Sequence, residues 1–332
     1  MREWSKDTEN KILKKSKFTL TWRILQILFV MWLLYGLYSV TINMLADKLN
    51  ITKENAYYTK IAVEWQTPNI RASFDLQEKD LSLLGTKEFS FPLQKMVGGD
   101  DILIGEANVT KKLSTNDSHI VYSHPGRDRL SSFSFSLPEH PVTHEKLKGN
   151  TNLNVWPTLE KLPEGTVGEL AFSTTNFMTA EELVTRLKEF DIHIVWLPLY
   201  TGELVDYMPG GTSSGDNSMS VIGYIGLTGG SNYNEDFHES LRIRYITEDN
   251  LEESQMLMEK NMKNVLAKPE SYYKNFLRLV YLKEQYTYIT SKGFTTYGAV
   301  VTGPVKELLK LKELEWIQGE QLGEVALWNW EL

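Results

Sequence analysis

The pentapeptide Gly211-Thr212-Ser213-Ser214-Gly215 matches the G-x-S-x-G pattern that carries the nucleophile of many serine hydrolases. In those enzymes the serine occupies a tight turn between a strand and a helix, where a histidine takes its proton. Here the motif runs into an apolar segment, 218–227, that is predicted to be a strand and not a helix. Asp236 and His238 follow in a polar loop, only two positions apart. The context favours a loop, and hydrolysis at Ser213 stays a minor alternative.

Four histidines fall within a short stretch and have acidic neighbours, a combination of side chains that zinc can bind. They are His119, His124, His140 and His144, with Asp117, Glu139 and Glu145. His140 and His144 have the spacing of a helical ligand pair, but Pro141 between them disfavours a helix. Histidines in surface loops explain the pattern better. We therefore predict no metal-binding residue, and no catalytic or cofactor-binding residue either.

The tetrapeptide Gly98-Gly99-Asp100-Asp101 is similar to the metal-binding turn of nucleotide cyclases. It is short, however, and glycine pairs next to aspartate are also typical of tight turns between two strands. We interpret it as a plain hairpin turn. The aromatic residues of Trp328-Asn329-Trp330 near the end of the chain are more typical of a core than of a ligand groove.

The chain contains no cysteine, which excludes disulfides, thiolate nucleophiles and thiolate-bound metal centres. Exported eukaryotic domains commonly use disulfides, so this composition favours a Gram-positive bacterium. The chain has 35 basic and 43 acidic residues, and residues 1–23 hold seven of the basic and three of the acidic ones. The remainder therefore has 28 basic and 40 acidic residues, a net charge of −12. Such an acidic body disfavours nucleic acid as a partner, because phosphate binding needs clustered Lys and Arg.

Residues 24–46 form a run of 23 residues without a charged side chain. A helix of that length extends about 35 Å, more than the roughly 30 Å of a bilayer's hydrocarbon core. The run is too long for a cleavable signal peptide, and the aromatic and basic residues before it disfavour a buried core helix. We predict an uncleaved membrane anchor that begins at Trp22, Arg23 and Ile24 and ends at Ala46.

The orientation of this anchor follows from the basic residues on its two sides. Seven Lys and Arg precede the run, whereas residues 47–69 contain only Lys48, Lys53 and Lys60. An excess of positive charge marks the cytoplasmic side. We predict a single-pass protein of the cell membrane that has a cytoplasmic N-terminus, an extracytoplasmic C-terminal domain, and the lipid bilayer as one partner.

The chain is predicted to have four parts. They are a cytoplasmic basic tail at 1–21, a transmembrane helix at 22–46, a β-rich extracytoplasmic region at 47–160 and an α+β domain at 161–332. In the third part, short apolar runs such as 61–65 alternate with Gly, Pro and Asp turns and predict strands. The fourth part predicts a mixed or antiparallel sheet with helices on one face, so the fold class is α+β.

Several signals mark the helices and the last strand of the fourth part. Thr179 with Glu182, and Asp249 with Glu252, have the spacing of capping boxes at helix starts. Residues 271–288 have an apolar stripe at helical spacing. Pro304 suits the first residue of a helix over 305–311, and 323–330 predicts a closing strand.

The chain resembles the membrane-anchored sigma-factor regulators, or anti-sigma factors, of Bacillus-like bacteria, which have paired N-terminal and C-terminal regulator domains. Three passages carry the resemblance. They are Lys14-Lys15-Ser16-Lys17 with Pro68-Asn69-Ile70; Gly168-Glu169-Leu170-Ala171-Phe172-Ser173 with the capped helix after it; and Tyr297–Leu309 with Gly323–Trp330.

The resemblance implies a partner and a task. Members of this family hold an extracytoplasmic-function sigma factor at the membrane and so keep it from RNA polymerase, while the outer domain receives an envelope signal. In the tail, the apolar side chains of Trp4, Ile12, Leu13 and Phe18 are the candidate contacts with that partner. A companion membrane protein is a further expected partner. The alternative is an anchored extracytoplasmic binding module with no cytoplasmic partner, and neither reading is an enzyme.

Overall fold

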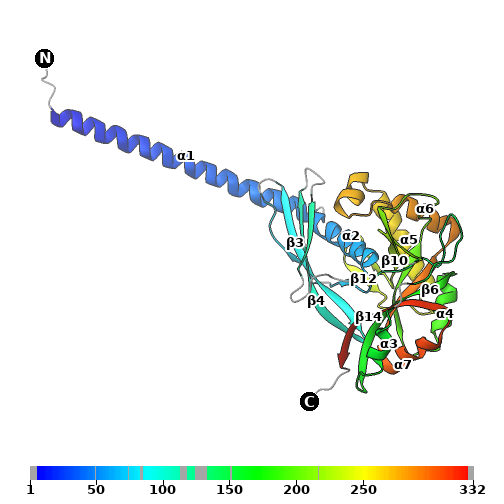
Figure 1. Ribbon diagram of the computed structural model, residues 1–332. Helices are drawn as coiled ribbons and strands as arrows, with labels where there is room; N and C mark the ends of the chain where they lie inside the picture. Colours follow the sequence, from blue (N-terminus) through cyan, green and yellow to red (C-terminus); the bar gives the residue numbers. More distant parts are fainter. Residues whose placement is uncertain are drawn as a thin grey trace.

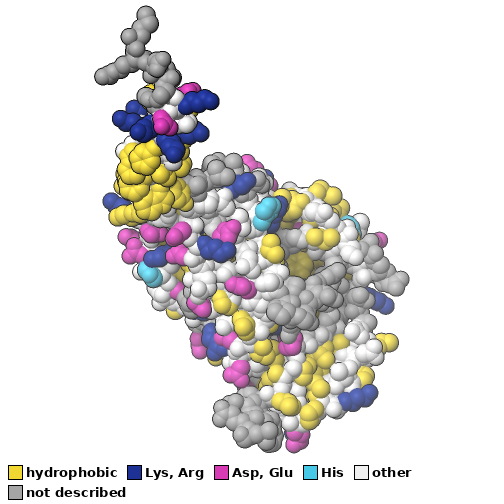
Figure 2. All heavy atoms as spheres, turned by 90° about the vertical axis from the view of Figure 1, so that its left-hand side faces the viewer, with side chains coloured by type: hydrophobic (Ala, Val, Ile, Leu, Met, Phe, Trp, Pro, Cys, Tyr) yellow, Lys and Arg dark blue, Asp and Glu magenta, His cyan; other side chains and the backbone are white. Residues whose placement is uncertain are grey.

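The computed structural model describes residues 6–48, 50–73, 75–82, 85–112, 118–123, 133–149, 152–215 and 217–327. A long helix, α1 (Lys6–Lys48), leads away from the body that holds the other elements (Figure 1). Over Glu9–Lys48 it is long and apolar enough to cross a membrane, and it is the single such helix in the described ranges. Its large hydrophobic side chains are exposed, as lipid contact requires. Figure 2 shows this hydrophobic band with Lys and Arg gathered at its N-terminal end.

A second helix, α2 (Ile51–Gln66), follows after a turn at Asn50, whose φ of 50° is left-handed. The prediction of a strand at 61–65 is wrong, because these residues form the last turns of α2. Apolar residues at positions 57, 58, 61, 62 and 65 recur at helical spacing, and 12 of the 16 residues of α2 are buried. This spacing extends over residues 57–65, but the five residues 61–65 taken alone are too short to distinguish a helix from a buried strand.

The first sheet is antiparallel and contains β1 (Arg71–Ala72), β2 (Gln77–Glu78), β3 (Thr86–Val97), β4 (Asp100–Lys112) and β5 (Ser118–Ser123). The long strands β3 and β4 form a hairpin whose turn is Gly98-Gly99, which confirms the hairpin prediction. Phe89, Phe91 and Leu93 alternate into the core along β3, and α2 packs on this side.

The second sheet has the strand order β10-β7-β13-β6-β14 and is antiparallel throughout. Its strands are β6 (Thr166–Thr179), β7 (His193–Tyr200), β10 (Ile225–Leu227), β13 (Thr295–Pro304) and β14 (Ile317–Leu327). One face is covered by α3 (Val155–Leu159), α4 (Ala180–Leu187) and α7 (Val305–Lys310). The predicted α+β class is confirmed.

The remaining elements lie at the β10 edge and on the other face of the second sheet. α5 (Leu251–Leu266) packs beside β10 together with α2, and α6 (Leu282–Lys292) packs against α5. Phe135, Leu137 and Met96 cover the face opposite α4, against Trp196 and Val300. Two hairpins complete the body: β8 (Gly211–Gly215) with β9 (Ser218–Ile222), and β11 (Ser231–Tyr233) with β12 (Glu239–Arg242).

Thr179 is confirmed as the N-cap of α4, because Glu182 N–H donates to Thr179 Oγ1 at 3.1 Å, whereas the Glu182 carboxylate pairs with Arg186 at 2.7 Å. The second capping box is wrong, since the residue that caps α5 is Asn250. The single helix predicted over 271–288 is broken into a π-helix, η1 (Tyr272–Phe276), and α6, and Arg278 between them has a φ of 61°. An apolar stripe continues across this break, which is why the sequence pattern does not detect it.

The predicted strand at 218–227 is two strands, because Gly223 with a φ of 89° turns the chain between β9 and β10. The helix predicted over 305–311 is α7, which begins at Val305 and ends at Lys310, and Pro304 is its N-cap residue and not its first residue. The closing strand is β14, which begins six residues before position 323. Trp328, Asn329 and Trp330 lie outside the described residues.

Candidate functional site

In the part of the chain that the structure describes, the predicted chemical motifs do not assemble into a reaction centre. Ser213 lies in the middle of β8 opposite Ser220 of β9, so the predicted loop is a hairpin strand and no helix follows the serine. Among the residues that the structure describes, no group of three or more His, Asp or Glu could hold a metal ion. His144 lies 3.6 Å from Glu139 at an exposed turn. Asp117 and His124 fall outside the described ranges.

The candidate partner-binding residues of the tail lie on α1. Ile12, Leu13 and Phe18 are exposed by 52%, 50% and 72%, while Trp4 precedes the described residues. At about 100° per residue, these three side chains point in directions roughly 100–140° apart around the helix. They form no single stripe, so a partner that used all three would have to surround the helix. Of the predicted anchor residues, Trp22 and Ile24 are exposed and Ala46 is buried against the body.

The end of α1 is tied to the body by a side chain from the predicted membrane span. Asn43 Oδ1 accepts a hydrogen bond of 2.8 Å from the backbone N–H of Leu81, a residue of the segment before β3. The Asn43 amide also donates to Ser39 O within α1 at 2.9 Å. The last turns of α1 are therefore fixed to the first sheet, and α2 begins only three residues after α1 ends.

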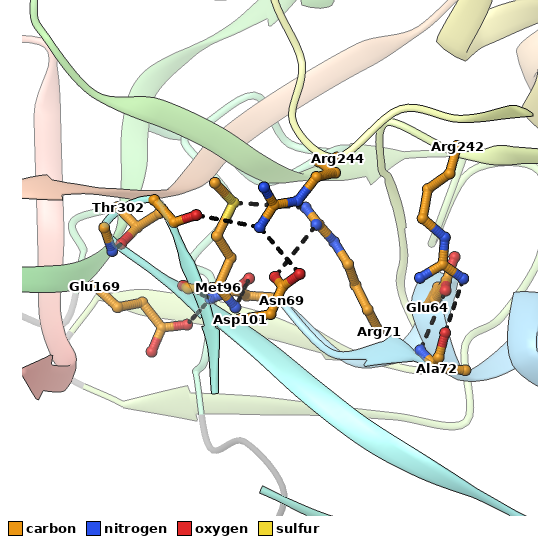
Figure 3. A network of polar contacts seen from close by, with 12 residues as sticks. Glu64, Asn69, Arg71, Ala72, Met96, Asp101, Glu169, Arg242, Arg244 and Thr302 are labelled. Carbon is orange, nitrogen blue, oxygen red and sulfur yellow. Dashed lines mark hydrogen bonds and ion pairs between the residues drawn. The ribbon is translucent and has the colours of Figure 1, made fainter. Parts of the chain in front are cut away.

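A buried polar junction joins the N-terminal half of the body to the second sheet (Figure 3). Asn69, just after α2, donates from Nδ2 to Glu169 Oε1 on β6 at 2.8 Å. The same amide pairs with the backbone of Met96 at the end of β3, donating to its carbonyl oxygen at 2.8 Å and accepting from its N–H at 3.3 Å. Asn69 thus connects α2, β3 and β6 through one side chain.

The carboxylate of Glu169 is completely buried and has three donors. Besides Asn69, Lys95 Nζ lies 2.6 Å from Glu169 Oε2, and the backbone N–H of Glu324 on β14 donates to the same oxygen at 3.1 Å. The Lys95 side chain is itself only 5% exposed. Desolvation of such a pair is costly, and removal of one partner would leave a buried charge uncompensated, which costs about 3–5 kcal/mol. Each of the two buried charges, on Lys95 and on Glu169, is therefore stabilised by the other.

The tip of the β3–β4 hairpin makes the next contact of the junction. The backbone N–H of Gly98 donates to Thr302 Oγ1 on β13 at 2.6 Å, and Thr302 donates to Gly168 O on β6 at 2.8 Å. Gly98 has a φ of 65°, and a Cβ atom there would lie 2.9 Å from Cβ of Val167. Glycine is required at this turn both by its backbone conformation and by the close approach to β6.

Charged residues lie beside the hairpin tip. Arg244 donates to Gly99 O at 3.1 Å and pairs with Asp101 at 3.0 Å, while Arg71 lies 3.8 Å from Asp101. Burial lowers the pKa of the Arg71 guanidinium to about 10, although the nearby Asp101 carboxylate favours its charged form. The turn that the sequence predicts as a plain hairpin thus docks onto the C-terminal part of the chain through its acidic residue.

The C-terminal end of α2 is fixed in the same way. Glu64 accepts at its backbone oxygen from Trp196 Nε1 on β7 at 3.1 Å, and its carboxylate accepts from Ala72 N–H at 3.3 Å. Arg242 donates to Ala72 O at 2.8 Å and pairs with Glu239 at 2.8 Å. Elements far apart in sequence therefore hold α2, and with it α1, in one position relative to the second sheet.

The three passages singled out in the sequence meet at this junction. Asn69 belongs to the first, Glu169 to the second, and Thr302 and Glu324 to the third. Sequence reasoning did not predict that they meet. One signal was present, since Glu169 is the one charged residue in the otherwise uncharged strand β6, and a charged residue in a buried strand needs a partner.

Comparisons with known proteins divide the chain into two matched regions, one on each side of the buried junction. Residues 10–102 match the family model described as sigma factor regulator N-terminal, and residues 159–324 match the one described as sigma factor regulator C-terminal. The chain is 22% identical over 282 residues to the probable anti-sigma-M factor YhdL of Bacillus subtilis (strain 168), covering 81% of this chain and 68% of that protein. No solved structure matches. Asn69, Lys95 and Gly98 lie in the first matched region, and their partners Glu169, Thr302 and Glu324 lie in the second.

Proposed function

This chain belongs to the sigma-factor regulator family, and we propose that it is an anti-sigma factor that holds an extracytoplasmic-function sigma factor at the cell membrane. The supporting observation is the match of both regulator regions together with the candidate membrane helix α1. A protein of this plan regulates transcription by sequestration, so it needs no catalytic residues. The outer domain would receive the signal, and the tail would hold the sigma factor.

The proposed orientation has residues 6–21 in the cytoplasm and residues 47–327 outside. It rests on the excess of Lys and Arg before the span, which disfavours translocation of the tail. The anionic inner leaflet would attract the same basic residues, each by about 1 kcal/mol. The charge difference across the span and the attraction to the inner leaflet therefore both favour a cytoplasmic tail.

The tail is a short binding element for a sigma factor. Stable protein interfaces bury about 800 Å² on each partner. The exposed side chains of Ile12, Leu13 and Phe18 point to different sides of α1, so we propose that the sigma factor encloses this helix and does not lie along one face. A companion membrane protein beside α1 would enlarge the surface.

Signal transfer would use the rigid connection between α1 and the body. Asn43 joins α1 to the first sheet, and the buried junction of Asn69 and Glu169 joins α2 to the second sheet. A change in packing at the junction would therefore shift α2, and α1 would follow because only Asn50 and its neighbour separate the two helices. We propose that this movement releases the sigma factor.

A reporter assay in a Gram-positive host tests the proposal. The gene is deleted, and promoters of the candidate sigma factors are compared with and without complementation by the full chain. We expect at least one sigma-dependent promoter to rise on deletion and to fall again on complementation. If no such promoter responds, the anti-sigma function fails, and the chain is better described as an anchored extracytoplasmic binding module.

A further inference from the structure

A groove of about 350 Å³ opens where the end of α2 meets the β8–β9 hairpin. Its lining includes Gln66, Phe133, Ser134, Ser213, Ser220 and Tyr224, and we refer to it as the serine groove. None of its described lining residues carries a charge. Its volume lies at the lower end of the range of small-molecule sites, which begins at about 300 Å³.

Three serines form a row of hydroxyl groups across the groove. Ser213 and Ser220 are directly opposite each other in the β8–β9 hairpin, so their side chains lie on the same face. Ser220 Oγ and Ser134 Oγ are 3.1 Å apart and share a hydrogen bond. Each hydroxyl can both donate and accept, so the row keeps hydrogen-bonding capacity for a ligand that also carries hydroxyls.

The other lining groups are held rigidly. Gln66 Nε2 donates to Ala62 O at 2.9 Å and to Leu277 O at 3.0 Å, which fixes the amide. The Tyr224 hydroxyl donates to Phe133 O at 2.9 Å, and its ring packs edge-on against Trp196 at 5.7 Å. Because these donors are used within the protein, the hydrogen-bonding groups left for a ligand are the serine hydroxyls and Gln66 Oε1, beside the rings of Phe133 and Tyr224.

This combination selects one class of ligand. A charged ligand would find no opposite charge among the described lining side chains, and a purely apolar one would remove water from Ser213 and Gln66 without replacing its hydrogen bonds. A neutral sugar has hydroxyls for the serines and polarised C–H groups that suit the negative face of an aromatic ring. We propose that the serine groove binds a neutral saccharide of two or three units.

The position of the groove relates this site to signalling. Gln66 is the last residue of α2, whereas Ser213, Ser220 and Tyr224 belong to the C-terminal part of the chain. A ligand in the groove would contact both and hold the end of α2 against the β8–β9 hairpin. The inference deepens the proposed sensing role, but saccharide binding is measured without any sigma factor, so the two proposals can fail separately.

The test uses the full chain in lipid nanodiscs, since glycoside detergents would compete for the site. N,N′,N″-Triacetylchitotriose and maltotriose are the neutral saccharide probes, and N-acetyl-tetraglycine amide, which lacks a free amine, is the neutral peptide probe. Binding is measured by saturation-transfer NMR and calorimetry. We expect at least one of the two saccharides to bind and Ser213→Arg to weaken its binding at least tenfold.

Thr212→Arg is the matched control, because Thr212 is exposed, adjacent in β8 and on the opposite face of the hairpin. It should bind the saccharide as the unaltered chain does, and circular dichroism should show both variants folded. Absence of binding by both saccharides, binding of the peptide alone, or equal binding by the two variants would overturn the proposal.

Discussion

The side-chain amide of Asn69 lies 2.8 Å from the carboxylate of Glu169, although 100 residues separate the two in the chain. Asn69 lies three residues after the end of α2, and Glu169 lies near the start of β6, so this bond connects the helix that follows α1 to the second sheet. Both residues are almost completely buried. The bond lies in a low-dielectric interior, where a satisfied polar network defines one arrangement and an unsatisfied one is costly. The junction therefore gives the body and the candidate membrane helix α1 a single relative position.

Lys95→Met should strongly destabilise the body, because it leaves the Glu169 carboxylate without its cation. We expect a loss of about 3–5 kcal/mol in the free energy of unfolding, measured by denaturant titration followed by tryptophan fluorescence in nanodiscs. Adding Glu169→Leu should recover much of the loss, since no buried charge then remains.

The matched control is Lys79→Met, which breaks the exposed pair of Lys79 and Glu88 at 2.8 Å in the same region. Exposed pairs contribute little, so this variant should unfold like the unaltered chain. Equal effects of Lys95→Met and Lys79→Met would contradict the importance of the buried pair.

Gly98→Ala should weaken docking of the β3–β4 hairpin, whereas Gly99→Ala should not. Gly98 has a left-handed φ and a methyl group there would meet Val167, while a Cβ atom at Gly99 has nothing within 4 Å. The left-handed conformation alone costs about 1–2 kcal/mol for a residue with a side chain. Hydrogen exchange of β3 and β13 is the measurement. Similar protection in the two variants would show that the hairpin tip does not need a glycine.

The stability of the body should rise with pH from about 8 toward 9.5. Burial, together with nearby Arg242, lowers the pKa of Lys60 to about 8, below that of a lysine in an unfolded chain. Between those pKa values the unfolded state binds more protons, so raising the pH favours the folded state. Below pH 8 Lys60 is charged in both the folded and the unfolded state, so burial of its ammonium group lowers the free energy of unfolding by the full amount.

Lys60→Met should remove this pH dependence and stabilise the body at pH 7. Measurements stop near pH 9.5, because the raised pKa values of buried tyrosines such as Tyr58, at about 12, reverse the trend above pH 10. Unfolding curves at pH 7, 8, 9 and 9.5 provide the comparison. A pH slope that persists in Lys60→Met would assign the effect to another group.

The absence of cysteine allows a direct test of orientation. Single cysteines are placed at exposed positions, Ser16→Cys in the tail and Thr212→Cys in β8. A membrane-impermeant maleimide should label Thr212→Cys in intact cells and Ser16→Cys only after lysis. The opposite labelling would place the tail outside and exclude contact with a cytoplasmic sigma factor.

The sequence predicts the local features of the fold better than its long-range contacts. Thr179 forms the expected N-cap of α4, and Gly98-Gly99 forms the expected hairpin turn, because each depends on residues close in sequence. The strand assigned to 61–65 was wrong because a run of five residues is too short to distinguish a helix from a strand, and the helical spacing of α2 extends over residues 57–65. The pairing of Asn69 with Glu169 depends on tertiary packing between two distant segments, which no local pattern records.

Co-purification from the membrane is the most direct test of anti-sigma activity. The full chain, and a version whose residues 1–21 are replaced by an unrelated basic segment, are crosslinked in cells, solubilised and analysed by mass spectrometry. We expect the full chain to capture a sigma factor and the chain with the replaced tail to capture none. Absence of any sigma factor from the full chain, or its retention by the chain with the replaced tail, would contradict it.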